Sequence, residues 1–83
     1  MSVYANLESF EGSITSETTL SLARKSRKIV ITNDHPTDEL TFKFNASETA
    51  ATLRGSETIS MYFTTDQIIL NGTNGNYRVW VFG

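Results

Sequence analysis

The chain has 83 residues, with seven Lys or Arg, nine Asp or Glu and one His, for a formal net charge of −2 at pH 7. This length allows a single domain, and the lack of cysteine excludes disulfides and thiolate metal sites. One histidine argues against a His-rich zinc site, and slight acidity argues against general nucleic-acid binding. No signal peptide or apolar run of ~18 residues points to export or a membrane. We therefore expect a protein of a reducing cytoplasm, without cofactor or metal.

Residues 1–12 (MSVYANLESFEG) lack sustained alternation of apolar and polar residues. Their apolar residues are Val3, Tyr4, Leu7 and Phe10, of which the last two are spaced as on a helix face. The segment is shorter than the about 12–15 residues that an isolated helix needs. We interpret it as an N-terminal arm that docks on a partner through these four residues. A strand or turn packed on its own domain is an equal alternative.

From residue 13 to 83 the apolar residues recur at every second position, which is the period of half-buried β-strands. The alternation predicts strands over residues 19–23, 28–33, 39–45, 49–54, 58–63, 67–71 and 76–82. Such short strands, separated by turns, indicate an all-β antiparallel sandwich or jelly-roll-like domain. The expected core consists of Leu20, Leu22, Ile29, Ile31, Leu40, Phe42, Phe44, Leu53, Ile59, Met61, Phe63, Ile68, Leu70, Tyr77, Val79 and Val81.

The connections between these strands are rich in turn residues. Residues 33–38 (NDHPTD) form a loop, because Pro36 cannot donate to a ladder and Asn and Asp bond to their own backbone. Residues 54–57 (RGSE) predict a tight reversal. Residues 71–76 contain two Asn-Gly pairs, the strongest short signal for a hairpin.

Residues that could carry catalysis do not gather in the sequence. His35 lies between Asp34 and Asp38, but nothing places a nucleophilic serine beside it. The nine acids are scattered rather than paired as glycoside hydrolysis requires. A calcium site in the same loop is a minor alternative; its oxygen ligands would come from Asn33, Asp34, Asp38 and Glu39. We expect that the protein is not an enzyme.

A cationic stretch separates two of the predicted strands. It holds Arg24, Lys25, Arg27 and Lys28 within five residues, at the expected end of a hairpin. These side chains form either a solvated turn or a contact with an acidic partner surface.

The last predicted strand is apolar on both faces, unlike the others. Tyr77, Val79 and Val81 alternate with Arg78, Trp80 and Phe82. Either the strand is central and covered on both sides, or its second face meets a partner. Trp and Arg are favoured interface anchors. We therefore predict an oligomer interface at Arg78, Trp80 and Phe82, and an aromatic platform for a sugar is the third option.

The stretch from residue 27 to 83 resembles small β-sandwich virion proteins of tailed bacteriophages. The resemblance rests on a strand that ends in Asn (29–33), a Leu-x-Phe-x-Phe strand (40–44), a Gly-Ser-Glu turn (55–57) and the closing aromatic strand. It implies a capsid decoration, head-fibre-base or tail module, often trimeric and anchored by a terminal arm to other virion proteins. Because the chain has no long fibre or second domain, we expect a capsid accessory protein that assembles in the host cytoplasm. The alternative is a carbohydrate- or receptor-binding module, which would expose Trp80 in a groove.

Overall fold

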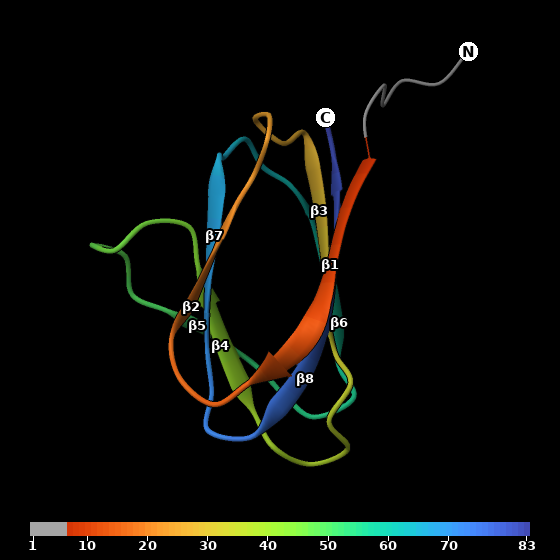
Figure 1. Ribbon diagram of the computed structural model, residues 1–83, viewed down its shortest axis with the longest axis vertical. Helices are drawn as coiled ribbons and strands as arrows, with labels where there is room; N and C mark the ends of the chain where they lie inside the picture. Colours follow the sequence, from red (N-terminus) through yellow and green to blue (C-terminus); the bar gives the residue numbers. More distant parts are fainter. Residues whose placement is uncertain (1–6) are drawn as a thin grey trace.

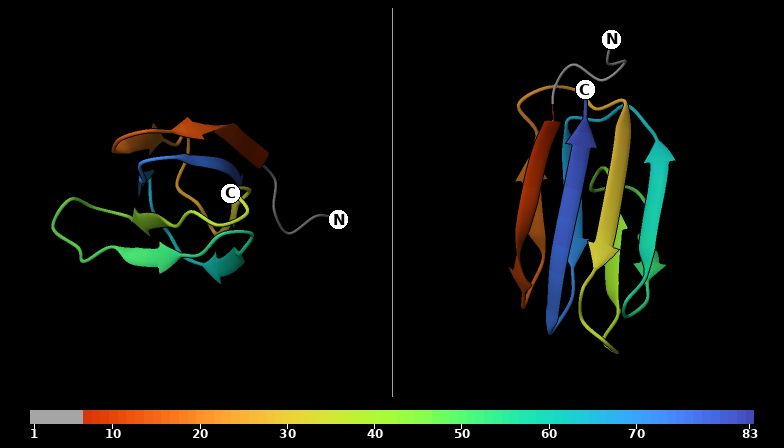
Figure 2. Two further views of the ribbon diagram at one scale, coloured as in Figure 1. Left: turned by 90° about the horizontal axis from the view of Figure 1, so that it is seen from below. Right: turned by 90° about the vertical axis from the view of Figure 1, so that its right-hand side faces the viewer.

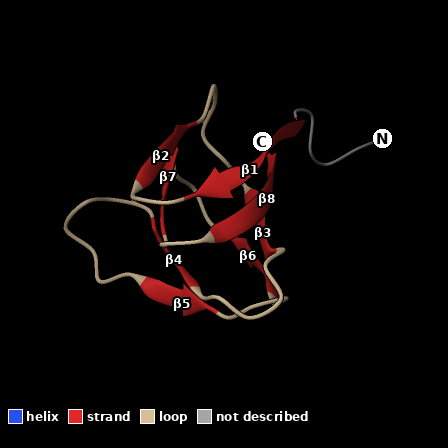
Figure 3. Ribbon diagram, turned by 60° about the horizontal axis from the view of Figure 1, so that its bottom comes forward, coloured by secondary structure: helices blue, strands red, loops and turns tan. Residues whose placement is uncertain are grey.

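The computed structural model describes residues 7–83, and this part of the chain contains eight strands and no helix (Figures 1 and 3). Accordingly, no helix there could cross a membrane. The strands are β1 (Leu7–Ile14), β2 (Thr18–Ser21), β3 (Lys28–Asn33), β4 (Leu40–Lys43), β5 (Ala51–Leu53), β6 (Thr58–Tyr62), β7 (Gln67–Asn71) and β8 (Gly75–Phe82).

The strands form two four-stranded antiparallel sheets that pack face to face (Figure 2). One has the order β1-β8-β3-β6 and is called here the β8 sheet; the other has the order β2-β7-β4-β5 and is called the β7 sheet. The prediction of an all-β antiparallel sandwich is therefore confirmed.

The chain crosses from one sheet to the other at every connection except the one between β4 and β5. The prediction of a hairpin at residues 71–76 is therefore wrong, because β7 and β8 belong to different sheets. No glycine of the described chain has a positive φ, whereas the Asn-Gly hairpin turn needs positive φ at both central residues. The loop of Arg24 likewise joins β2 to β3 across the sandwich and does not end a hairpin.

The core lies between the sheets and is largely aliphatic. Of the predicted core residues, Phe44, Ile59 and Met61 are only partly buried and pack on its margin. Phe63 is 40% exposed, so its assignment to the core is wrong. The alternation missed Ile14, which ends β1 inside the core, and Ile69, which is buried although it follows Ile68 on the central strand β7.

The proposed arm is corrected where the structure describes it. Residues 7–12 belong to β1, which pairs along its whole length with β8, from Leu7 opposite Phe82 to Ile14 opposite Gly75. This part of the arm is an integral edge of the sheet, as the alternative interpretation had it. Val3 and Tyr4 lie outside the described residues.

The 54–57 turn connects the sheets through two special backbone positions. The N–H of Glu57 donates to the carbonyl oxygen of Arg54 at 3.1 Å, which confirms the tight reversal. Ser56 carries the positive φ, 62°, rather than the glycine before it. Gly55 is required by close approach instead, because a Cβ there would lie 2.7 Å from the carbonyl oxygen of Pro36.

Candidate functional site

The outer face of the β8 sheet carries three aromatic residues that do not enter the core, Tyr62, Trp80 and Phe82. The strand register sets three rows of outward side chains across the sheet. They are Leu7–Phe82–Lys28–Tyr62, Ser9–Trp80–Val30–Ser60 and Glu11–Arg78–Thr32–Thr58.

Large apolar side chains of this face remain open to solvent. Leu7 is 61% exposed and Tyr62 is 75% exposed, and they stand at opposite ends of one row. Trp80 and Phe82 are partly buried on the strand between them. The prediction that β8 is apolar on both faces is explained by its place between β1 and β3, and its outer side is only partly covered.

Arg78 is fixed in place on this face by two neighbours. Its Nε donates to Oδ2 of Asp34 at 2.7 Å and its Nη2 donates to Oδ1 of the same carboxylate at 3.0 Å. These hydrogen bonds, with the attraction of the Asp34 charge, raise the pKa of Arg78 above its ordinary value. The guanidinium carbon lies 5.2 Å from the centre of the Trp80 ring, in cation–π range.

A shallow hollow lies beside this pair. It has a volume of about 290 Å³ and is lined by Ser9, Phe10, Glu11, Arg78 and Trp80. It therefore combines an aromatic edge with one carboxylate, one guanidinium and one hydroxyl group. A second cation–π contact, with Nζ of Lys28 at 5.5 Å from the Tyr62 ring centre, lies at the far edge of the face.

The four predicted partner-binding cations have different surroundings, and Arg27 among them is exposed in the loop. Lys28 points outward from β3, and Arg24 lines a small cavity with Leu7 and Val81. Lys25 lines a separate hollow at the margin of Phe44 and Phe63. Ser26, which follows Lys25, is buried and anchors the loop. Its hydroxyl group donates to the carbonyl oxygen of Phe63 and accepts from the backbone N–H of Thr65.

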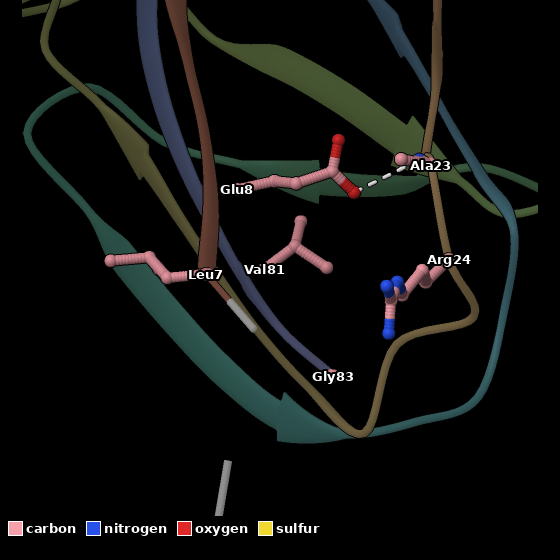
Figure 4. Close-up of a pocket in the computed structure, with 6 residues that line it drawn as sticks. All are labelled: Leu7, Glu8, Ala23, Arg24, Val81 and Gly83. Carbon is pink, nitrogen blue, oxygen red and sulfur yellow. Dashed lines mark hydrogen bonds between the residues drawn. The ribbon is translucent and has the colours of Figure 1, made fainter. Parts of the chain in front are cut away.

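The small cavity brings together residues from the predicted arm and the cationic stretch (Figure 4). Its volume is about 130 Å³. Figure 4 shows the Glu8 side chain reaching toward Ala23, whose N–H donates to Oε1 of Glu8 at 2.9 Å, whereas Leu7 points away from this contact. The other arm residue in the described chain, Phe10, packs against the core. Leu7 is thus the arm residue that the structure leaves open to a partner.

The His35 loop has a structural role. Nδ1 of His35 accepts from the backbone N–H groups of Thr37 and Asp38, at 3.2 and 2.9 Å. Asn33 is fully buried, and its Oδ1 accepts from the N–H of His35 at 3.0 Å. Asn33 is therefore occupied and unsuited to serve as a calcium ligand. Within residues 7–83, no three His, Cys, Asp or Glu side chains gather closely enough to hold a metal.

Comparison with known proteins gives the fold and no family. No protein-family model matches the sequence, and no curated protein matches it significantly. An HTH_3 family transcriptional regulator from Vibrio cholerae is similar in structure, with a TM-score of 0.67 at 15% identity over 93% of this chain. The match covers 43% of the regulator, so this chain spans less than half of its length.

Two further structures define the class of fold. A cupin domain from Bordetella pertussis superposes with a TM-score of 0.59 at 11% identity, over 93% of this chain and 81% of that one. A de novo designed double-stranded β-helix superposes with a TM-score of 0.57 at 11% identity, over 95% of this chain and all of the design. The fold of this small sandwich is thus similar to that of cupin domains and of the double-stranded β-helix. At these identities the likeness shows the fold alone.

Proposed function

We propose that the chain is a non-enzymatic structural protein of a tailed-bacteriophage virion, attached to another virion protein through the outer face of its β8 sheet. The observation that carries the proposal is this face, where exposed Leu7 and Tyr62 flank partly buried Trp80 and Phe82. An apolar surface with a central Trp beside an Arg is typical of a protein–protein contact. The resemblance of residues 27–83 supplies the class of particle.

The geometry of Arg78 supports a contact with protein. Its guanidinium makes two hydrogen bonds to Asp34 without a partner, which lowers the side-chain entropy that binding would cost. The expectation of an oligomer held by Arg78, Trp80 and Phe82 rests on the apolar second face of β8, and the preference for a trimer rests on the phage resemblance; both stay predictions.

Binding of a carbohydrate is the second candidate, and the hollow beside Trp80 favours it. Aromatic rings with a few convergent polar groups are typical of such sites, and Glu11 and Ser9 supply polar groups there. Against it, Arg78 already lies over the Trp80 ring, where a sugar would have to stack. A glycan array that detects binding abolished by Trp80→Ala would replace the structural proposal with this one.

Cross-linking mass spectrometry of purified phage particles tests the structural proposal. The chain should be present in the particle, and amine cross-links to a second virion protein should start from Lys28, on the outer face of the β8 sheet. Lys43, on β4 of the opposite sheet, is the matched control and should give few such cross-links. Absence of the chain from particles, or cross-links concentrated on Lys43, would contradict the proposal.

A substitution tests the same face independently. Trp80→Ala should lower the number of copies per particle, because it removes the central apolar contact. Thr19→Ala, at an exposed position of β2, should leave that number unchanged. Equal incorporation of both folded variants would move the attachment site elsewhere.

A further inference from the structure

Strand β6 lies at one edge of the β8 sheet (Figure 2). It pairs with β3 through residues 58–62, and no other strand of the described chain pairs with it. A strand in this position presents a row of backbone N–H and C=O groups that can template another strand.

The hydrogen-bond pattern tells which backbone groups face outward. The N–H of Phe63 donates to the carbonyl oxygen of Arg27 at 3.1 Å, and the N–H of Asn33 donates to the carbonyl oxygen of Glu57 at 2.9 Å. In an antiparallel ladder every second residue bonds to a given neighbour. Residues 57, 59, 61 and 63 therefore face β3, and the backbone groups of Thr58, Ser60 and Tyr62 face away from it.

The β6 edge lacks the features that usually protect an edge strand, which are charges, proline, bulges or short length. Residues 58–63 (TISMYF) contain no charged residue, no Pro and no Gly. The other edges of the described sheets differ: β1 carries Glu8 and Glu11, β2 has four residues, and β5 has three. An unprotected edge in one place alone points to a use for that edge.

The sequence of β6 is complementary to itself. A two-fold axis through Ser60 would place Ser60 opposite its counterpart and Thr58 opposite Tyr62. Ile59 would then face Met61, so that partly exposed apolar side chains of the sandwich margin cover each other. In this register the residues that bond across the two-fold axis are Thr58, Ser60 and Tyr62, whose backbone groups face away from β3. Two copies would share about six backbone hydrogen bonds, two for each facing pair.

We infer that two copies of this chain associate by antiparallel pairing of their β6 strands about a two-fold axis at Ser60, forming one continuous sheet. A closed pair uses up both edges and stops further addition. Five residues a side bury less than the about 800 Å² per partner of a stable interface. The free dimer is therefore weak, and it is strengthened where copies are concentrated on a particle. The pairing itself does not require the proposed function, but its strengthening on a particle rests on that function, and the β6 edge shares Tyr62 with the outer face of the β8 sheet.

Sedimentation velocity of the whole chain from roughly 1 µM to 1 mM tests the inference. The wild type should pass from monomer to dimer and stop there. Ser60→Lys and Ser60→Glu should each raise the dimer dissociation constant by at least about tenfold, because two like charges face each other at the axis. An equimolar mixture of the two variants should restore the dimer, since unlike charges then meet.

Ser9→Lys is the matched control. Ser9 ends the same cross-strand row as Ser60, but at the opposite edge of the sheet, and its substitution should leave the dimer intact. Circular dichroism should show that all variants remain folded, because both serines are exposed. A wild type that stays monomeric throughout, a dimer insensitive to the charges at Ser60, or a mixture that fails to restore it would overturn the inference.

Discussion

The buried amide of Asn33 donates a hydrogen bond to the carbonyl oxygen of Leu53 at 3.2 Å and thereby joins β3 of one sheet to β5 of the other. The same Nδ2 lies 2.8 Å from the carbonyl oxygen of Asp38 and 3.1 Å from that of Arg54. One side chain thus satisfies backbone groups from the ends of two loops as well as from the opposite sheet.

Asn33→Ala should lower the free energy of unfolding by about 3 kcal/mol, because the carbonyl group of Leu53 loses its donor in the interior and those of Asp38 and Arg54 lose theirs at part-buried sites, at about 1–3 kcal/mol for a buried group. Urea denaturation provides the measurement. Asn76→Ala, at an exposed position of β8, is the control and should change stability little. Equal effects of the two substitutions would show that the buried network contributes nothing.

Phe42→Ala should cost about 3–5 kcal/mol, the usual price of removing a buried phenyl ring, and a domain this small could unfold as a result. Phe42 is 6% exposed, whereas Phe63 is 40% exposed although its ring stacks on Phe44 at 4.6 Å. Phe63→Ala should therefore cost clearly less in the same thermal melt. A Phe42→Ala protein with the wild-type melting temperature would contradict the described core.

The 54–57 turn predicts opposite effects at two adjacent positions. Gly55→Ala should destabilise the fold, because the new methyl group would lie 2.7 Å from the backbone of Pro36 and Thr37. Ser56→Gly should be neutral or stabilising, by up to about 1 kcal/mol, since glycine adopts a positive φ without strain. Melting temperatures of the two variants check this order. A higher melting temperature for Gly55→Ala than for Ser56→Gly would contradict the described conformation of the turn.

The place of β1 in the β8 sheet predicts a contrast between two of its residues. Phe10→Ser should destabilise the protein, because Phe10 packs against the core. Leu7→Ser, at an outward position that is 61% exposed, should leave the unfolding midpoint almost unchanged. If Phe10→Ser left stability intact, residues 7–12 would again be candidates for a docking arm that lies outside the folded domain.

Alternation predicted all seven strands from residue 18 onward, because each has one face on the core, and it placed Leu40, Phe42 and Val79 correctly inside. It missed β1, because a charged residue, Glu8, occupies an inward position of that strand and breaks the alternation. Glu8 lies at the margin of the sandwich, where it accepts a hydrogen bond from the N–H of Ala23. Alternation also gives no information on which sheet a strand joins, so the 71–76 loop was read as a hairpin.

The candidate surface was only partly foreseeable for the same reason. The pattern of β8 assigned Arg78, Trp80 and Phe82 to one face. The register that adds Leu7 and Tyr62 to that face depends on pairing between strands far apart in sequence. The free edge at Ser60 follows from sheet order, which no local signal encodes.

The central position of β8 has a consequence for synthesis on the ribosome. β8 lies between β1 and β3, so the β8 sheet lacks its middle until residues 75–82 have been made and have left the exit tunnel. Until then, β1 and β3 have been synthesised but lack the strand between them, and the uncharged segment 58–63 is already present. Folding governed by such distant pairings is slow and exposed to aggregation. A chaperone that shields nascent chains should therefore raise the soluble yield of this protein.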